Sequence, residues 1–236
     1  MPNRVVLNNV DHRDLTVAIR YGAEFGDAVN QVQVFPAEFE AAQREFPIVF
    51  QRGPAGLDAV ALLGLDRDEN LFLNGDRWTS RHIPLLQQRG PFSIGTDATG
   101  GGTPMLHIDL DDPRTGAPDG AAIFLQHGGN GPYLNHVTHL LRLIHAGVEG
   151  ARTMYAAFDA LGLIEPVALE VMLNEDTRYA ITGYEVLARE RLNALTGTQL
   201  ETLQKADFLA PAFLIPTSLG NIGELIRRKN ARRGAI

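Results

Sequence analysis

Histidine and aspartate side chains that could hold a metal ion or exchange protons gather in the middle of the sequence. His107 and Asp109 alternate along a predicted strand, so their side chains share one of its faces. His136 and His139 are three residues apart on a predicted helix, where such residues are neighbours. His127 precedes them in a glycine-rich loop. If the strand lay against the helix, these side chains could form a metal site or an acid–base pair, and the chain would be a metal-dependent enzyme.

The same residues also fit a purely structural interpretation. The helix lacks the His-Glu-x-x-His pattern of zinc-dependent enzymes. Its histidines flank an apolar stripe, where polar side chains occur on any surface helix. A strand with one exposed face likewise alternates polar and apolar residues without forming a site. Both interpretations stay open from the sequence alone.

A second group of residues is typical of protein interfaces rather than of reaction centres. Arg77, Trp78 and Arg89 lie in segment 60–92, which is dense in charged and large apolar residues. Tryptophan and arginine are enriched at the energetic centres of interfaces, so these three are candidate contacts for a partner. Trp78 is the single tryptophan of the chain, and core packing is the alternative role for it.

Several other chemistries are excluded by what the sequence lacks. The chain has no cysteine, which excludes disulfides, thiol nucleophiles and cysteine-based zinc sites. It has no Gly-x-Ser-x-Gly elbow, and the glycine-rich segment 95–104 lacks the Lys-Ser/Thr of a phosphate-binding loop.

An acidic turn beginning at Asp66 starts like a calcium loop. It has Leu71 where glycine is needed and Arg77 where the bidentate glutamate belongs, so it is a charged turn.

Hydrophobic periodicity indicates which elements position these residues. The apolar residues of segment 36–46 recur at helical spacing, and those of 137–158 mark the longest helix. Segments 167–173 and 178–186 bracket a polar turn at 174–177 and predict a hairpin. The remaining strands are short and fall mostly in the first half of the chain.

These elements predict an α+β fold with a mixed or antiparallel sheet and helices packed on it. Its first half is strand-rich and its second half helix-rich. The length of 236 residues suits one large domain, 1–236, with a candidate subdomain boundary in the turn-rich segment near 113–120.

Two local signals surround the only tryptophan. Asn74-Gly75 is a strong hairpin signal, because the central residues of a type I′ turn need positive φ. A helix is predicted over 81–88, capped by Thr79 or Ser80 and ended by a left-handed glycine at Gly90.

Three further signals lie near the C-terminus. Thr198 begins a capping-box pattern, and Ser218 is placed to cap the final helix. The basic run at 227–233 is interpreted as a solvated helix end, where cations are favoured by the helix dipole.

Composition limits the partners and the compartment. The formal charge is −7, so nucleic acid is an unfavourable partner. We predict no membrane span, because we find no run near the ~20 apolar residues a spanning helix needs. The N-terminus lacks a cleavable signal pattern, which favours the cytoplasm, although export without cleavage is compatible with the sequence. Oligomeric state is left open.

The sequence resembles the SapC family of bacterial proteins. The resemblance rests on short motifs in order: Phe35-Pro36-Ala37-Glu38-Phe39, Pro47-Ile48-Val49-Phe50, Leu62-Leu63-Gly64-Leu65, Glu69-Asn70-Leu71-Phe72, Arg77-Trp78, Ile83-Pro84, and Arg89 with Pro91-Phe92. Ser218-Leu219 and the run Ile226-Arg227-Arg228-Lys229 match more loosely. The chain departs from the family at Gly90, where we expect an aromatic residue, and at 185–189, which lacks the expected acidic pattern.

The resemblance implies a role without fixing any catalytic residue. Family members are described as related to surface layers or peptide transport. We therefore expect a non-enzymatic binding or accessory protein that handles a peptide or protein partner in such a pathway, with no cofactor. The metal-dependent enzyme built on the histidines is the alternative.

Overall fold

The computed structural model describes residues 3–54, 56–96, 104–172 and 178–234. It contains helices and antiparallel sheets, with strands mostly in the first half and helices in the second, so the predicted fold class is confirmed. The predicted turn at 174–177 and most of the glycine-rich segment 95–104 lie outside the described residues.

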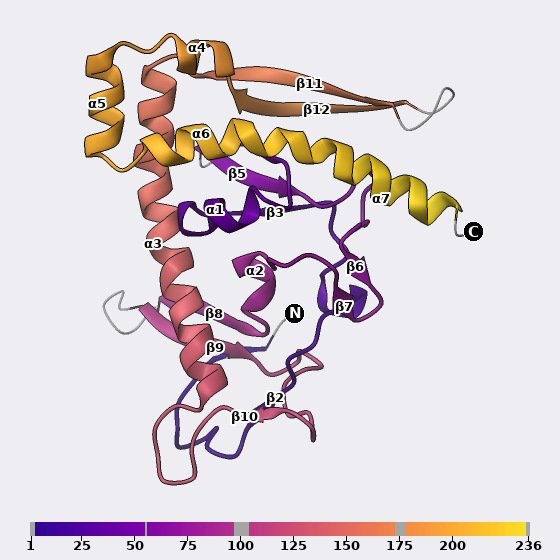
Figure 1. Cartoon of the computed structure of the whole chain (residues 1–236). Helices are drawn as coiled ribbons and strands as arrows, with labels where there is room; N and C mark the ends of the chain where they lie inside the picture. Colours follow the sequence, from indigo (N-terminus) through magenta and orange to yellow (C-terminus); the bar gives the residue numbers. More distant parts are fainter. Residues whose placement is uncertain (1–2, 55, 97–103, 173–177, 235–236) are drawn as a thin grey trace. The chain divides into compact units, whose positions relative to one another are not determined.

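Figure 1 labels most of these elements along the chain. The strands are β1 Arg4–Val6, β2 Thr16–Val17, β3 Gln31–Gln33, β4 Ile48–Gly53, β5 Gly56–Leu62, β6 Leu73–Asn74, β7 Arg77–Trp78, β8 Phe92–Thr96, β9 Pro104–Asp109, β10 Ala121–Ala122, β11 Ile164–Met172 and β12 Arg178–Leu187. The α-helices are α1 Phe39–Ala42, α2 Leu85–Gln88, α3 Pro132–Ala160, α4 Arg189–Asn193, α5 Gly197–Lys205, α6 Leu209–Ser218 and α7 Ile222–Gly234. Short 3-10 helices are η1 Ala23–Phe25, η2 Pro36–Glu38 and η3 Leu219–Asn221.

The chain divides into two compact units that interleave in sequence. The first unit comprises Met1–Asp27, Gly75–Arg77 and Leu85–Ala146, and the second comprises Ala28–Asn74, Trp78–Pro84 and Gly147–Ile236. The segment 113–120, our candidate boundary, lies inside the first unit.

The first unit is built on a three-stranded antiparallel sheet in the order β1-β9-β8. As expected, β9 alternates: Ile108 is fully buried, and Leu106 and Leu110 pack against the same core. The first half of α3 contributes Leu134, Val137 and Leu141 to this core. The register pairs Arg4 with Asp109, which matters for the site described below.

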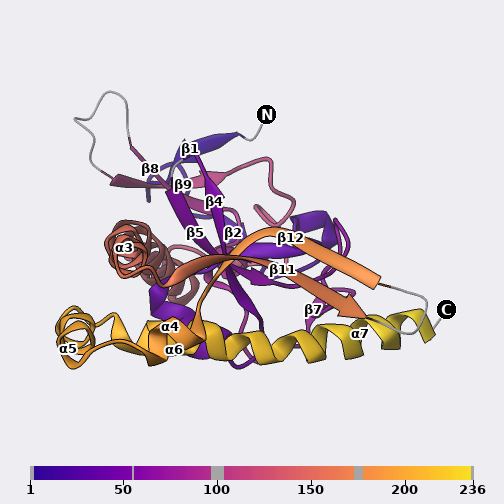
Figure 2. The ribbon, with the colours of Figure 1, turned by 90° about the horizontal axis from the view of Figure 1, so that it is seen from above.

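The second unit is built on a five-stranded sheet in the order β11-β12-β4-β5-β3. The predicted hairpin is confirmed as β11 and β12, which pair from Ile164 with Leu187 to Met172 with Arg178. Figures 1 and 2 show α6 and α7 running in line along this hairpin. The apolar residues that recur over 36–46 are core: Phe39, Ala42 and Phe46 are fully buried. The Phe46 ring meets the ring of Phe72 edge to face at 4.7 Å.

Two polar side chains attach α6 and η3 to the segment that runs from the end of α1 to the start of β4. The buried Ser218 hydroxyl accepts a hydrogen bond from the Ile48 amide at 2.8 Å and donates one to the Ile215 carbonyl. The Asn221 side-chain amide donates to the carbonyl of Gln43 at 2.7 Å. Ser218 therefore ends α6 and joins it to the sheet, and it does not cap the final helix as predicted.

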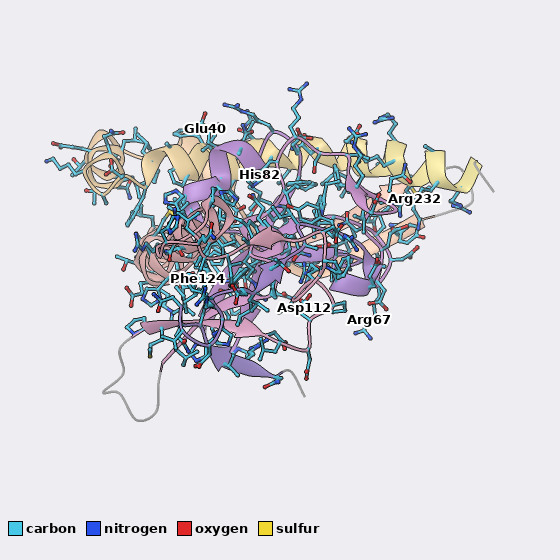
Figure 3. The ribbon with its side chains drawn as sticks, turned by 90° about the horizontal axis from the view of Figure 1, so that it is seen from below. Glu40, Arg67, His82, Asp112, Phe124 and Arg232 are labelled. Carbon is cyan, nitrogen blue, oxygen red and sulfur yellow. The ribbon has the colours of Figure 1, made fainter. Side chains whose placement is uncertain are left out.

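The basic C-terminal helix docks onto the segment between β5 and β7. Our interpretation of it as a solvated end is wrong for Lys229, whereas Arg227, Arg232 and Arg233 are exposed. Lys229 is buried and binds the carboxylates of Asp66 and Glu69. The Arg228 guanidinium lies 4.3 Å from the centroid of the Phe72 ring. Arg232, labelled in Figure 3, donates a hydrogen bond to the Asn70 carbonyl at 2.7 Å. The acidic turn is thus held by cations of the protein itself.

Helix α2 begins at Leu85 and not at residue 81 as predicted. The residue before a proline is pushed away from the helical region, so Pro84 delays the start of the helix. Thr79 and Ser80 instead donate hydrogen bonds to the carbonyls of Phe72 and His82. The predicted exit is confirmed, because Gly90 has φ 59°.

Two other local predictions shift by a residue or two. The capping box of α5 is formed by Thr196 and Gln199, so the helix begins before the predicted cap at Thr198. The hairpin at Asn74-Gly75 forms between β6 and β7, but of its turn residues only Gly75 has positive φ. The turn is therefore not the expected type I′, which needs positive φ at both central residues.

One stretch reaches the length and apolar character of a membrane span, contrary to our expectation. Among the described residues, Leu209–Gly234 meets both criteria, with a mean hydropathy of 1.3 in its most apolar window. A core helix passes the same test. In this fold 28% of that window is buried, and Ala212, Ile215 and Leu225 are among the buried residues of the stretch.

Candidate functional site

The predicted metal residues do not converge in the part of the chain that the structure describes. His136 and His139 are exposed on α3, and His127 is exposed in its loop. On β9, His107 Nδ1 lies 3.1 Å from the Met105 carbonyl, and the Asp109 carboxylate accepts a hydrogen bond from the Asp111 amide. Within the described residues, no three histidine, aspartate or glutamate side chains are placed to hold a metal ion.

The three residues predicted to contact a partner differ in how exposed their side chains are. Arg77 is exposed at the hairpin, whereas Trp78 is only 6% exposed. Burial of Trp78 favours the core-packing alternative, because a buried ring is not available to a partner. Arg89 is half-buried at the end of α2 and lines a cavity.

This cavity belongs to the first unit and has a volume of about 260 Å³. Its charged lining residues come from four separate places in the sequence: Arg4, Asp27, Arg89, Asp109, Asp112 and Arg114. Pairing of β1 with β9 brings Arg4 next to Asp109, and the turn after β9 supplies Asp112 and Arg114. We call it the arginine cavity.

Arg114 and Asp112 form its rigid wall. The Arg114 Nε and Nη2 donate to the two Asp112 carboxylate oxygens at 2.9 and 2.7 Å. The Arg114 guanidinium also lies 4.9 Å from the centroid of the Phe25 ring. Burial alone would raise the pKa of Asp112. Hydrogen bonds from Arg114 outweigh the effect of burial, so the pKa of Asp112 lies below its ordinary value. Asp112, labelled in Figure 3, is therefore an ionised carboxylate paired with Arg114.

Arg89 is less well satisfied than Arg114. Its Nη1 donates to the Phe92 carbonyl at 2.9 Å. Its Nε is buried and has no hydrogen-bond partner among the described residues. Burial lowers the pKa of Arg89, and the positive charges of Arg4 and Arg114 lower it further. The lining thus combines three arginines and three aspartates around a buried donor that lacks an acceptor among the described residues.

Three other polar groups border Arg114. The Asp27 carboxylate accepts a hydrogen bond from the Gly22 amide at 2.8 Å, and burial raises the pKa of Asp27. Burial raises the pKa of Tyr133 to about 12 and also raises that of Tyr21. Both phenols are therefore neutral hydrogen-bonding groups at physiological pH.

This arrangement is suited to binding an anion. Arginine forks recognise planar or tetrahedral oxyanions, and a partly dehydrated pocket strengthens the attraction. From the sequence we had named only Arg89 and Asp109 among these lining residues. We did not name Arg4 and Arg114 from the sequence, because their local spacing does not predict the β1–β9 pairing that brings them together.

The fold and cavity together define an α+β protein with a cavity lined by charged side chains. The SapC family model matches residues 7–225, and the chain belongs to the SapC family. Neither a curated protein nor a solved structure matches it.

Proposed function

We infer that this chain is a non-enzymatic binding or accessory protein of the SapC type, which handles a peptide or protein partner in a surface-layer or transport-related pathway. The arginine cavity is its recognition site. Family membership supports the pathway only through what the resemblance implies, whereas the cavity supports a binding role directly.

The observation that carries this proposal is the buried Nε of Arg89, which has no hydrogen-bond partner among the described residues. A buried donor without an acceptor costs about 1–3 kcal/mol, and neighbouring like charges add to that cost. A structural arginine is normally paired, as Arg114 is with Asp112 in the same cavity. A ligand that supplies the missing acceptor for Arg89 Nε would explain why this donor is buried without a partner.

The alternative of a metal-dependent enzyme has no comparable support. Its five residues, His107, Asp109, His127, His136 and His139, do not form a ligand set within the described ranges. Asp109 lines the arginine cavity and is shared by both hypotheses, but there its cross-strand neighbour is Arg4 and not a histidine.

A comparative capture experiment tests the binding role. Tagged wild-type protein, Arg89→Gln and Arg13→Gln are used as baits in lysate of the bacterial host, and captured proteins are quantified by mass spectrometry. Arg13 is the matched control, because it lies in the same unit in a largely exposed pair with Asp14.

We expect a protein that the wild type and Arg13→Gln both enrich and that Arg89→Gln loses. Enrichment that ignores the Arg89 change, or no enrichment by the wild type, would contradict the proposal. Circular dichroism of each bait confirms that the loss is not unfolding. Fractionation of the same cells tests the proposed cytoplasmic location.

A further inference from the structure

We propose that the arginine cavity binds a carboxylate group, presented by the C-terminus or an acidic side chain of a peptide, and that Arg89 is its main contact. This inference rests on the proposed binding function and names the chemical group that the site recognises.

Three other arginines of this chain bind carboxylates side-on through two hydrogen bonds. Arg52, Arg114 and Arg227 each donate from Nε and Nη2 to both oxygens of one carboxylate. The six distances lie between 2.6 and 2.9 Å. This side-on, two-bond geometry matches the planar carboxylate.

Arg89 is held so that the same edge has no carboxylate. Its Nη1 bonds to the Phe92 carbonyl, which fixes one end of the guanidinium, and Nε is the donor without a partner. Because Nε is buried, a carboxylate in the cavity must draw the guanidinium toward itself to reach it. That movement would exchange an unsatisfied donor for a charged hydrogen bond.

The surrounding charges favour one carboxylate over a phosphate. Arg4 and Arg114 add positive potential at Arg89, whereas Asp112 offsets part of it and Asp27 and Asp109 also line the cavity. The three acids oppose a dianion more strongly than a monoanion. The volume of about 260 Å³ is below the roughly 300–1,000 Å³ typical of whole drug-sized ligands. The cavity therefore suits one group of a larger ligand.

Calorimetry with small probes tests this assignment. The probes are N-acetyl-dialanine, its C-terminal amide, N-acetyl-glutamic acid α-amide and inorganic phosphate, at low ionic strength to limit screening. We expect one or both carboxylate probes to bind, and the neutral amide not to bind. Which of the two binds more tightly distinguishes a terminal from a side-chain carboxylate.

Variants identify the contact. Arg89→Gln should weaken carboxylate binding by roughly ten- to a hundredfold, the worth of one charged hydrogen bond. Arg89→Lys keeps the charge but removes the two-bond edge, so it should also weaken binding. Arg13→Gln should bind as the wild type does. Equal binding of acid and amide, tightest binding of phosphate, or indifference to both Arg89 changes would overturn the inference.

The two proposals fail in different ways. If the lysate partner depends on Arg89 but no carboxylate probe binds, the binding function stands and the carboxylate assignment fails. If the probes bind through Arg89 but no partner is captured, the site takes a carboxylate and the peptide or protein partner is wrong.

Discussion

Lys229 donates a hydrogen bond from Nζ to Glu69 Oε1 at 2.7 Å, although the two residues are 160 positions apart. Their side chains are 10% and 13% exposed. The contact joins α7 to the acidic turn after β5, and Asp66 of the same turn also binds Lys229. Within the second unit, this nearly buried ammonium group therefore holds α7 against the acidic turn.

Removing this ammonium should destabilise the fold. In Lys229→Met the two carboxylates lose their cation, and we expect a loss of about 2–4 kcal/mol in the free energy of unfolding. This is slightly below the range for a fully buried pair, because Asp66 is half-exposed. Urea unfolding followed by the fluorescence of the single tryptophan measures it.

The matched control is Lys205→Met. Lys205 is the other lysine of the chain, and its pair with Glu201 is 73% and 62% exposed. Exposed pairs of this kind contribute about 0–1 kcal/mol. Similar losses for both lysines would show that burial of Lys229 is not what makes it important.

Ser218 offers a second test of how α6 is attached. In Ser218→Ala the buried Ile48 amide loses its acceptor, and we expect a loss of about 1–3 kcal/mol. Thr217→Ala is the control, because Thr217 is exposed and bonds only within its own helix. Thermal unfolding of the two variants should separate them. A loss for Thr217→Ala as large as that for Ser218→Ala would argue against the cross-sequence bond.

Periodicity predicted the large elements because it reports local burial. The helix α3 and the hairpin of β11 and β12 are long, and their patterns are uninterrupted enough to identify them. The alternation of Leu106 and Ile108 likewise gave the inward face of β9. Where a proline competes with a cap signal, as Pro84 does with Thr79, the signal alone misplaced the helix start.

Long-range pairings could not be predicted from local signals. The basic run at 227–233 has the composition of a solvated helix end, and only the fold shows that Lys229 meets an acidic turn. In the same way, Arg4 and Arg114 become a site with Arg89 only after β1 pairs with β9. The carboxyl and imidazole groups that the sequence offered as metal ligands do not form a ligand set within the described residues.

The role of Trp78 is decided by one substitution. Because its side chain is 6% exposed, Trp78→Ala should leave a large cavity and cost about 3–5 kcal/mol. Trp78→Phe keeps most of the packing and should cost less. Circular dichroism during heating measures both variants. A Trp78→Ala protein that melts like the wild type but loses a partner would instead support an interface role.

The pair of Asp112 and Arg114 should make stability depend on pH in the acid range. The pKa of Asp112 is lower in the folded than in the unfolded chain, so protonation favours unfolding. Its contribution is fully present above its unfolded pKa of about 3.9 and is lost as the pH falls through the lower folded value.

Unfolding of Asp112→Asn should therefore differ from that of the wild type in two ways. The variant should be less stable near neutrality, and its stability should fall less between about pH 4 and pH 2. Urea midpoints across that range measure both effects. Asp14→Asn is the control, because the Asp14 side chain is 88% exposed. An unchanged acid slope in Asp112→Asn would exclude this pair as a source of the pH dependence.

Gly90 sets the shape of the chain beside Arg89. It has φ 59°, and a Cβ atom at this position would lie 2.9 Å from the Tyr133 hydroxyl oxygen. Gly90→Ala should cost about 1–2 kcal/mol for the left-handed backbone, and more if the hydroxyl cannot move. Gly116→Ala is the control, because Gly116 also has positive φ but has open space around it.

A double-mutant cycle tests the role of the Tyr133 hydroxyl. Adding Tyr133→Phe should lower the free-energy cost of Gly90→Ala but not that of Gly116→Ala, as measured by urea unfolding. Equal costs at both glycines, unaffected by Tyr133→Phe, would mean that backbone conformation alone requires glycine here. The hydroxyl would then not be what excludes the aromatic side chain expected from the family at this position.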